Sequence, residues 1–226
     1  RGFRPAAATS GAAAAATAAP STVGDVLGFW FGGLWGTEAM NDSAQVARQN
    51  PLWWGTAPDF KPLSAEEKRA VDASCQPFVN LIRASGKGEL EARSKEWKTG
   101  DGMFAQVILC DQLSRNAFRG TSEAFAYDPR GMHYARQLHE LGLYKDWPMP
   151  AFTFLLTPGQ HSEDLQDHEM NTALLAFMRD RFGDIAGVQI VAEHCASHKA
   201  VIDRFGRYPH RNLALGREST PEELAW

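Results

Sequence analysis

Apolar residues recur at helical spacing along the chain from Val23 onward. In "VGDVLGFWFG" they occupy positions i, i+3, i+4, i+7 and i+8, which form one face of a helix, and two glycines end the pattern. Similar stretches predict further helices at about 64–84, 102–117, 121–141, 162–182, 188–205 and from 220 onward. No stretch alternates apolar and polar residues over the length of a strand. The pattern therefore predicts an all-α fold of antiparallel helical hairpins.

Local signals predict where several helices begin and end. Ser64 stands three residues before Glu67, the spacing of a capping box, in which each side chain accepts from the backbone N–H of the other residue. Ser162 is expected to cap the next helix, and the two acids after it would lie at the positive end of the helix dipole. Gly206 is expected to end a helix in the left-handed conformation.

Proline and glycine mark the predicted connections between these helices. Segment 34–62 is rich in proline, glycine and aromatic residues and is predicted to be a long packed loop. The proline-marked segment 147–161 is predicted to lead into the helix that follows it. Pro129 is expected to kink or split the helix predicted at 121–141, because proline lacks a backbone donor.

Composition limits the classes of protein to consider. Of 226 residues, 44% are hydrophobic and 11% aromatic, enough for an ordinary soluble core. The longest apolar runs fall far short of the roughly 18–20 residues that span a bilayer. A net charge of -4 and a pI of about 6.0 indicate no general attraction to nucleic acids or acidic membranes. Any anion recognition must therefore be local.

Cysteine usage and the first residues bear on the cellular compartment. Cys75, Cys110 and Cys195 are far apart, which argues against a disulfide framework and for a reducing compartment. Residues 1–22 are rich in alanine and contain arginine but no acid. They are typical of a mitochondrial or chloroplast transit peptide, or alternatively of a low-complexity tail without an address, in which case the protein would be cytoplasmic. We expect one domain over 23–226.

Charged residues recur at one-turn spacing in "CDQLSRNAFRG". Asp111, Arg115 and Arg119 are four residues apart and project from one side of the predicted helix. They form either a solvent-facing ladder of ion pairs or a partly buried polar cluster, and the apolar residues around them leave little helix surface exposed.

Two other stretches contain histidine at one-turn spacing. Asp164 and His168 could pair as a base oriented by a carboxylate, or form half of a metal site, although helix capping explains the same residues. His194 and His198 have the spacing of two zinc ligands, but the sequence offers no third ligand. We therefore predict no metal site.

Residues 204–217, "RFGRYPHRNLALGR", contain four arginines, a histidine and an asparagine but no acid. Arginine presents a rigid fork of donors that suits phosphate and carboxylate. The stretch is therefore either a pocket for an anion or part of an internal network, with Asp111 or Glu163 as acidic partners. The chain has no P-loop, dinucleotide fingerprint or nucleophile elbow, which excludes the commonest enzyme classes.

Four motifs resemble one known family: "FWFG", "DQLSRNAFRGTSEAFAYDP", "HSEDLQDHE" and "RFGRYPHRNLALGRESTPEEL", in this order. The chain from about Val23 to Trp226 is similar to the family catalogued as domain of unknown function 924. The resemblance implies a tetratricopeptide-like, all-α fold but no established activity. The family's recurrent polar positions match Asp111, Gln112, Arg115, Asn116, Arg119, His161, Ser162, Glu163, His198, Arg204, Arg207, His210, Arg211, Asn212 and Arg217.

The chain departs from the family pattern at three places. Residues 157–160 read Thr-Pro-Gly-Gln where the family has a phenylalanine-rich segment, which would reshape a pocket entrance. His168 stands where an amide is usual, and His194 is not a residue that the family pattern predicts.

Three hypotheses about function follow, and all depend on these distant polar stretches folding together. The first is a binding or scaffold protein for a small anionic molecule or peptide group, with ligand-binding residues Gln112, Arg115, Asn116, Arg119, His198, Arg204, Arg207, Arg211, Asn212 and Arg217. The second is a hydrolase of phosphorylated or ester substrates, with His161 or His210 as base, Asp111 or Glu163 orienting it, and Arg115, Arg207 and Arg211 stabilising negative charge. The third is an accessory subunit of an organellar complex. The sequence does not identify a cofactor, so this question stays open.

Overall fold

The computed structural model describes residues 19–226, and these residues form helices connected by turns. Within this range no strand is present, only an isolated bridge between Thr56 and Pro62. The predicted all-α fold is confirmed. The helices are α1 Val23–Trp30, α2 Ser43–Val46, α3 Asn50–Trp54, α4 Ala65–Cys75, α5 Val79–Gly86, α6 Leu90–Arg93, α7 Gly100–Val107, α8 Ser114–Ala117, α9 Asp128–Glu140, α10 Met149–His161, α11 Leu165–Phe182, α12 Ala186–Phe205, α13 Asn212–Leu215 and α14 Pro221–Ala225.

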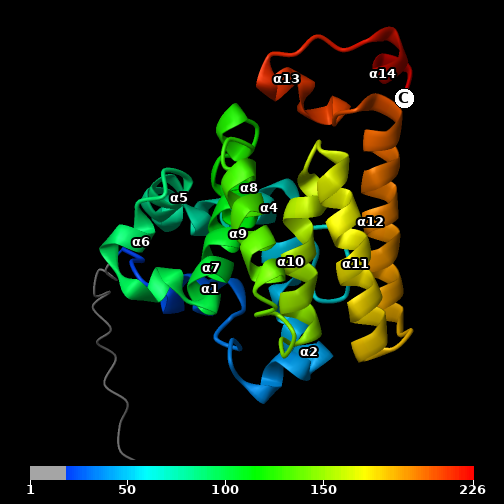
Figure 1. Ribbon diagram of the computed structural model, residues 1–226. Coiled ribbons are helices and arrows are strands. Elements are labelled where there is room, and N and C mark those ends of the chain that lie inside the picture. The colour runs from blue at the N-terminus through cyan, green and yellow to red at the C-terminus, as the bar shows by residue number, and fades with distance from the viewer. Residues whose placement is uncertain (1–18) are drawn as a thin grey trace, which may run out of the picture.

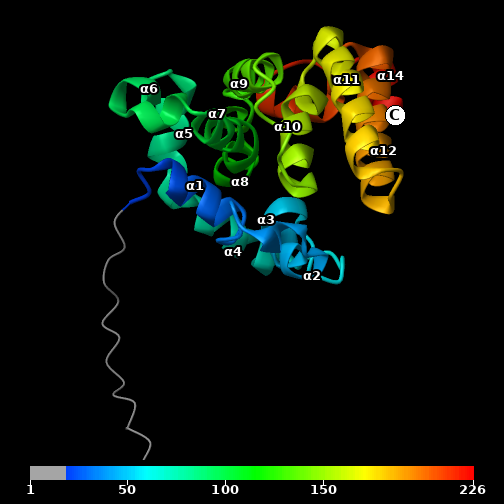
Figure 2. The same cartoon turned by 60° about the horizontal axis from the view of Figure 1, so that its bottom comes forward.

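The longest helices stand side by side, and the end of the chain crosses over them (Figure 1). Helices α10, α11 and α12 follow one another through short connections and pack in sequence order, while α7 packs against α9. After α12 the chain turns back over the helix ends and carries α13 and α14, as the turned view also shows (Figure 2). Gly206 begins this turn with φ 67° in the left-handed conformation, as predicted.

Aromatic side chains bring three helices together at the centre of the core. Trp30 of α1 packs edge-on against Phe154 of α10, with ring centroids 5.2 Å apart. Phe31 stacks on Phe104 of α7 at 5.9 Å. All four side chains are buried, and burying a large apolar side chain contributes about 1.5–3 kcal/mol. This packing fixes α10, whose last residue belongs to the site described below.

One proline-containing segment differs from the expectation, and another agrees with it. Segment 147–161 is mostly the helix α10, with Pro158 in its interior. The Thr157 hydroxyl donates to the carbonyl of Phe154, 2.9 Å away, and so satisfies the acceptor that Pro158 leaves without its usual partner. The helix predicted at 121–141 is split before Pro129, as expected: residues 122–124 form a 3-10 turn, and α9 begins at Asp128 with Pro129 in its first turn, where a missing N–H costs nothing.

Several predicted helix boundaries are correct and others are wrong. The capping box of Ser64 and Glu67 is confirmed at the start of α4. Segment 34–62 was expected to be a loop, but α2, α3 and 3-10 turns occupy much of it. Because α10 extends to residue 161, the N-cap of α11 is Asp164, which accepts from the Gln166 N–H at 2.9 Å, and not Ser162.

A π-helical segment connects α7 to α8. The helix predicted at 102–117 is a continuous helical stretch, but residues 108–113 adopt the wider turn, in which the Ser114 N–H bonds to the Leu109 carbonyl. All residues of this segment are buried, including Asp111. Such π-helical turns are frequent at functional sites.

Other findings concern membranes, cysteines and the first residues. Among residues 19–226, no helix combines the length and apolar character that a membrane span requires.

All three cysteines are free and buried, and burial raises the pKa of Cys75 and Cys195 to about 11, so these thiols stay protonated at neutral pH. Most of the predicted leader, residues 1–18, lies outside the described residues. The leader and the single-domain boundary therefore stay predictions.

Candidate functional site

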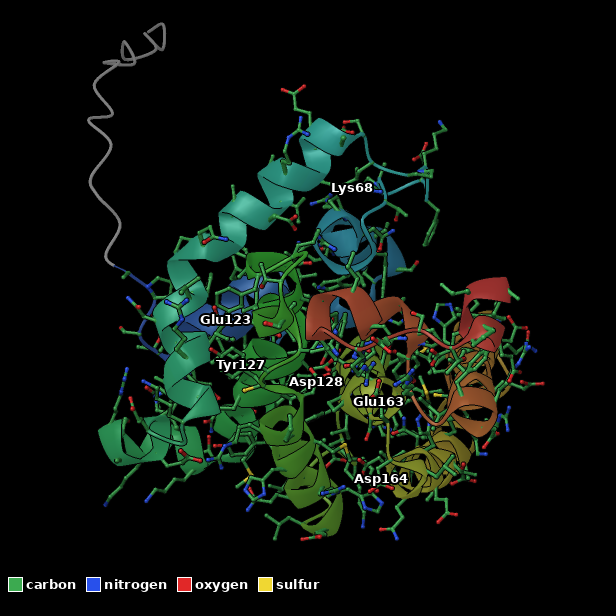
Figure 3. The ribbon with its side chains drawn as sticks, turned by 90° about the horizontal axis from the view of Figure 1, so that it is seen from above. Lys68, Glu123, Tyr127, Asp128, Glu163 and Asp164 are labelled. Carbon is green, nitrogen blue, oxygen red and sulfur yellow. The ribbon has the colours of Figure 1, made fainter. Side chains whose placement is uncertain are left out.

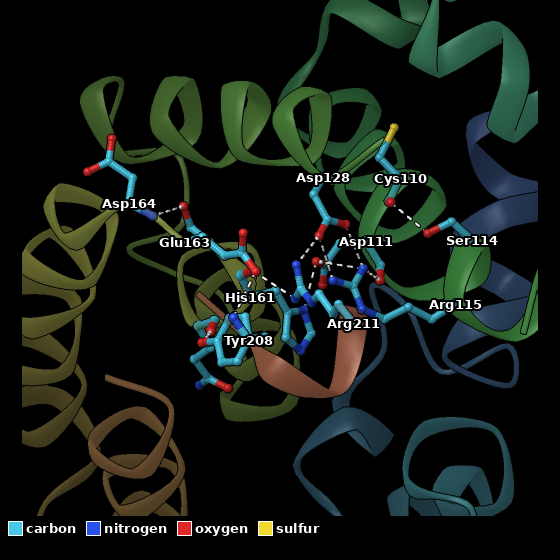
Figure 4. Close-up of polar contacts among 12 residues, drawn as sticks. Cys110, Asp111, Ser114, Arg115, Asp128, His161, Glu163, Asp164, Tyr208 and Arg211 are labelled. Carbon is cyan, nitrogen blue, oxygen red and sulfur yellow. Dashed lines mark hydrogen bonds and ion pairs between the residues drawn. The ribbon is translucent and has the colours of Figure 1, made fainter. Parts of the chain in front are cut away.

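The structure brings the polar stretches of the sequence together where the C-terminal segment crosses the helix ends. Viewed from above, Asp128 at the start of α9 and Glu163 after α10 lie beside this segment (Figure 3). The close-up shows Asp111, His161 and Arg211 connected through a network of hydrogen bonds and ion pairs (Figure 4). These residues come from the π-helical segment, the end of α10, and a 3-10 turn at Pro209–Arg211.

Asp111 is a fully buried carboxylate with three polar partners. Its Oδ1 lies 2.8 Å from Nδ1 of His161 and 3.1 Å from the Arg115 guanidinium, and its Oδ2 accepts from Gln112 at 2.6 Å. Burial by itself raises the pKa of Asp111, but Arg115 and His161 outweigh this effect and hold the pKa well below its usual range. Asp111 is therefore ionised at neutral pH.

His161 ends α10 and is held by Asp111. Burial, reinforced by the charge of Arg115, lowers the pKa of His161 to about 4, so its ring is neutral at neutral pH. An ionised Asp111 can only accept, so Nδ1 of His161 carries the proton and Nε2 carries a lone pair. A neutral imidazole oriented by a buried carboxylate is the arrangement of a general base.

Asp128 is a central residue that the sequence analysis missed. Its two oxygens each accept from Arg115 at 2.9 Å, and Oδ2 also accepts from Arg211 at 3.1 Å. Burial raises the pKa of Asp128 to about 6, even though Arg115 opposes the shift, and the charge of Asp111 adds to it. The signal for this residue was its place in the motif "AFAYDP", directly before a helix-starting proline.

Arg211 is buried, yet much of its hydrogen-bonding capacity is unused. Its guanidinium lies between the rings of Phe125 and Tyr208, 4.8 and 4.6 Å from their centroids. Nη1 donates to Asp128, and Nη2 donates to the His161 carbonyl at 2.8 Å. Among the described residues its Nε finds no partner. An arginine has five N–H donors, so Arg211 keeps donors for a further acceptor.

A cavity of about 250 Å³ opens in front of these groups. Its ionisable lining side chains are arginine, histidine and tyrosine, and the carboxylates Asp111 and Asp128 lie behind the arginines. We call it the small cavity. The lining residues are Arg115, Arg119, Gly120, Ala124, Phe125, His161, His198, Tyr208, His210 and Arg211.

Two further histidines line the small cavity: His198, predicted to bind the ligand, and His210, predicted as an alternative base. His198 donates from Nδ1 to the His194 carbonyl at 2.8 Å, and its ring centroid lies 5.8 Å from that of His161. His210 is exposed. Burial lowers the pKa of His198, and partial desolvation together with the charge of Arg211 lowers that of the more exposed His210. Neither imidazole has a carboxylate partner like that of His161.

Other predicted site residues hold the C-terminal segment in place and do not line the small cavity. Glu163 does not orient a histidine: it pairs with Arg217 at 2.8 and 3.0 Å and accepts from the Tyr208 N–H. Arg207 pairs with Glu223 at 2.6 and 2.8 Å. These contacts attach the segment to the end of α10 and to α14.

The remaining predicted residues also have structural partners. Arg204 forms an exposed pair with Glu222. The side chain of Asn212 donates to Glu223, that of Asn116 to the Leu52 carbonyl, and that of Arg119 to Asp72. Of these residues only Arg119 also lines the small cavity.

The structure forms neither of the two histidine arrangements that the sequence analysis weighed as alternatives. His168 bonds through Nε2 with the Ser162 carbonyl at 3.0 Å, not with Asp164, whose side chain caps α11. His194 contributes its backbone carbonyl to His198, not its ring. Over residues 19–226, the structure has no group of three or more histidine, cysteine or acidic side chains placed to hold a metal ion.

The family of this chain can now be stated. The model of a family described as "Bacterial protein of unknown function (DUF924)" matches residues 26–226, so the chain belongs to this family. A solved structure, that of the protein of unknown function ATU0120 from Agrobacterium tumefaciens, is 28% identical with a TM-score of 0.58, over 70% of this chain and 83% of that one. No curated protein sequence matches the chain. The tetratricopeptide-like assignment stays a prediction.

Proposed function

We propose that this protein binds a small molecule through an anionic group, a phosphate or carboxylate, in the small cavity. The character of the lining supports this most: it combines arginine and histidine and includes no carboxylate. The buried Arg211 in this lining also keeps unused donors. Charge-assisted hydrogen bonds to a guanidinium are strong, each contributing about 1.5–3 kcal/mol. An oxyanion would supply the acceptors that Arg211 lacks.

Calorimetric titration with inorganic phosphate and with acetate tests this proposal. Arg119 is more than half exposed and lines the cavity, so Arg119→Ala is expected to fold and to weaken binding about three- to tenfold. Arg204→Ala is the matched control, because Arg204 forms an exposed ion pair away from the cavity and its loss should leave the affinity unchanged. Equal loss in both variants would contradict a site in this cavity.

A second candidate function is hydrolysis, and the Asp111–His161 pair favours it. His161 Nε2 would take a proton from a water molecule as the water oxygen attacks the carbonyl carbon or phosphorus of an ester or phosphoester. The C–O or P–O bond to the leaving alcohol would then break, and the proton on His161 would pass to the departing oxygen. Arg115 and Arg211 would stabilise the negative charge that develops on the substrate oxygens. His210 lacks a carboxylate partner, which makes His161 the stronger candidate for the base.

Esterase and phosphatase profiling of the purified protein tests this second function. Turnover should fall at least about a hundredfold in His161→Gln, in line with the usual contribution of a general base. His210→Gln is the comparison variant and should retain most of the activity. Turnover that persists in His161→Gln would exclude this residue as the base.

Two broader expectations belong to the same proposal. An organellar location rests on the composition of residues 1–22, and cell fractionation tests it. A role as a subunit of a larger assembly would show as co-elution with other proteins in native size-exclusion chromatography. Neither expectation changes the chemistry proposed for the small cavity.

A further inference from the structure

A second and larger cavity adjoins the small one. Its volume is about 730 Å³, and we call it the large cavity. Phe125, His161 and Arg211 line both cavities, so the two meet at the groups proposed to bind the anion. The small cavity alone falls below the roughly 300–1,000 Å³ typical of small-molecule sites, whereas the large cavity lies within that range. A ligand of ordinary size would therefore extend from one into the other.

The large cavity has a lining surface that is more apolar than polar. Apolar and aromatic side chains from α9, α10, α13 and the turn before α9 contribute to it. Those that do not also line the small cavity are Ala126, Tyr127, Pro129, Met132, Pro158 and Leu215. Such a lining favours an apolar body on the ligand, because burial of apolar surface from water is the main driving force for binding.

The acids of the large cavity are already neutralised by arginines. Glu123 pairs with Arg83 at 2.8 Å, and Asp167 accepts from Arg136 at 3.0 Å. The other two acids, Asp128 and Glu163, have the arginine partners described above. Since each carboxylate has its own guanidinium, the large cavity does not require a cationic group on the ligand.

We propose that the two cavities bind one ligand with two parts, an oxyanion in the small cavity and an apolar body, such as an aromatic ring, in the large cavity. This inference rests on the anion site proposed above and narrows the ligand class. It favours phosphates or carboxylates of apolar molecules over sugar phosphates and other highly polar metabolites. Arg211, stacked on Phe125 at the junction, would contact both parts of the ligand.

Four probes test this proposal by calorimetry: inorganic phosphate, glycerol phosphate, phenyl phosphate and 3-phenylpropionate. Phenyl phosphate is expected to bind at least tenfold more tightly than inorganic phosphate, and glycerol phosphate about as weakly as inorganic phosphate. Comparison of phenyl phosphate with 3-phenylpropionate distinguishes a phosphate head group from a carboxylate.

Two variants on α13 form a matched pair. Leu215 lines the large cavity, whereas Leu213 is 95% exposed and lines neither cavity. Leu215→Asn should reduce the advantage of phenyl phosphate at least threefold and leave inorganic phosphate binding unchanged, and Leu213→Asn should change neither. Both side chains are partly or fully exposed, so both variants are expected to fold.

The outcomes separate this inference from the anion site itself. If inorganic phosphate and phenyl phosphate bind equally well, or if Leu215→Asn behaves like Leu213→Asn, the two-part ligand is wrong and the anion site stands. If no probe binds, the anion site is wrong and the two-part ligand with it.

Discussion

Arginines of one short stretch have two different roles in this protein. Arg207 and Arg217 each make a two-bond pair with a glutamate, and each also donates to at least one carbonyl or amide oxygen; we call an arginine with such a pair saturated. Arg211 lies between them in sequence, is more deeply buried, and makes only two hydrogen bonds. Pairing therefore distinguishes them: the saturated arginines hold the C-terminal segment, and the unsaturated one faces the cavities.

The largest expected effect concerns the buried carboxylate behind the small cavity. Asp111→Ala leaves Arg115 and Arg211 with one carboxylate, Asp128, between them, and this buried excess of positive charge is expected to lower the free energy of unfolding by about 3–5 kcal/mol. Urea denaturation, monitored by circular dichroism, measures the free energy of unfolding. Asp72→Ala, which breaks the more exposed pair with Arg119, should cost no more than about 1 kcal/mol. Similar losses in both variants would contradict a special role for the buried acid.

Loss of a saturated arginine should affect stability rather than binding. Arg217→Ala removes both bonds to Glu163 and is expected to lower the free energy of unfolding by about 1–3 kcal/mol. Limited proteolysis should then cleave more rapidly after Gly206, because the segment has lost one attachment to α10. If phosphate binding fell while stability stayed constant, Arg217 would belong to the ligand site instead.

Replacement of Arg211, the unsaturated arginine, should affect anion binding more than stability. Lysine keeps the charge of Arg211 but cannot reproduce its fork of donors, so Arg211→Lys is expected to weaken phosphate binding about tenfold, or roughly 1.4 kcal/mol. Stability should change less than in Arg217→Ala. Calorimetry and urea denaturation of the two variants together test the distinction. If Arg211→Lys binds phosphate as tightly as the unchanged protein, the donor fork of Arg211 does not contribute to the proposed site.

The pH dependence of anion binding is the smallest expected effect. Asp128 has a pKa of about 6, so between pH 7 and pH 5 it gains a proton and no longer neutralises Arg115 and Arg211. His161, with a pKa of about 4, adds positive charge only if the bound anion raises that pKa. Protonation of either group makes the surroundings of the small cavity more positive. Sulfate, whose charge is constant over this range, should therefore bind a fewfold more tightly at pH 5 than at pH 7.

Titration calorimetry with sulfate in two buffers of different ionisation enthalpy measures the proton uptake directly. Asp128→Asn should reduce the pH dependence, and the exposed Asp59→Asn should not. Sulfate affinity that is constant from pH 7 to pH 5 would contradict the assigned role of Asp128.

Local signals were reliable where the nearest residues decide the structure. The capping box at Ser64 and the left-handed Gly206 depend on contacts within a turn, and the structure contains both. The sequence pattern did not predict a helix through Pro158, because the carbonyl that this proline leaves free is satisfied by a side chain, the Thr157 hydroxyl. It also failed at Ser162, because tertiary packing extends α10 up to that residue.

The sequence by itself determined that this protein is a helical member of its family, since helix periodicity and caps arise from residues within a few positions of one another. It also identified most residues of the polar cluster. Only the tertiary structure decided their roles, because the partners lie far away along the chain: 54 positions separate Arg217 from Glu163, and 83 separate Arg211 from Asp128. Whether an arginine is saturated depends on the acids that folding brings to it, and no local pattern encodes that.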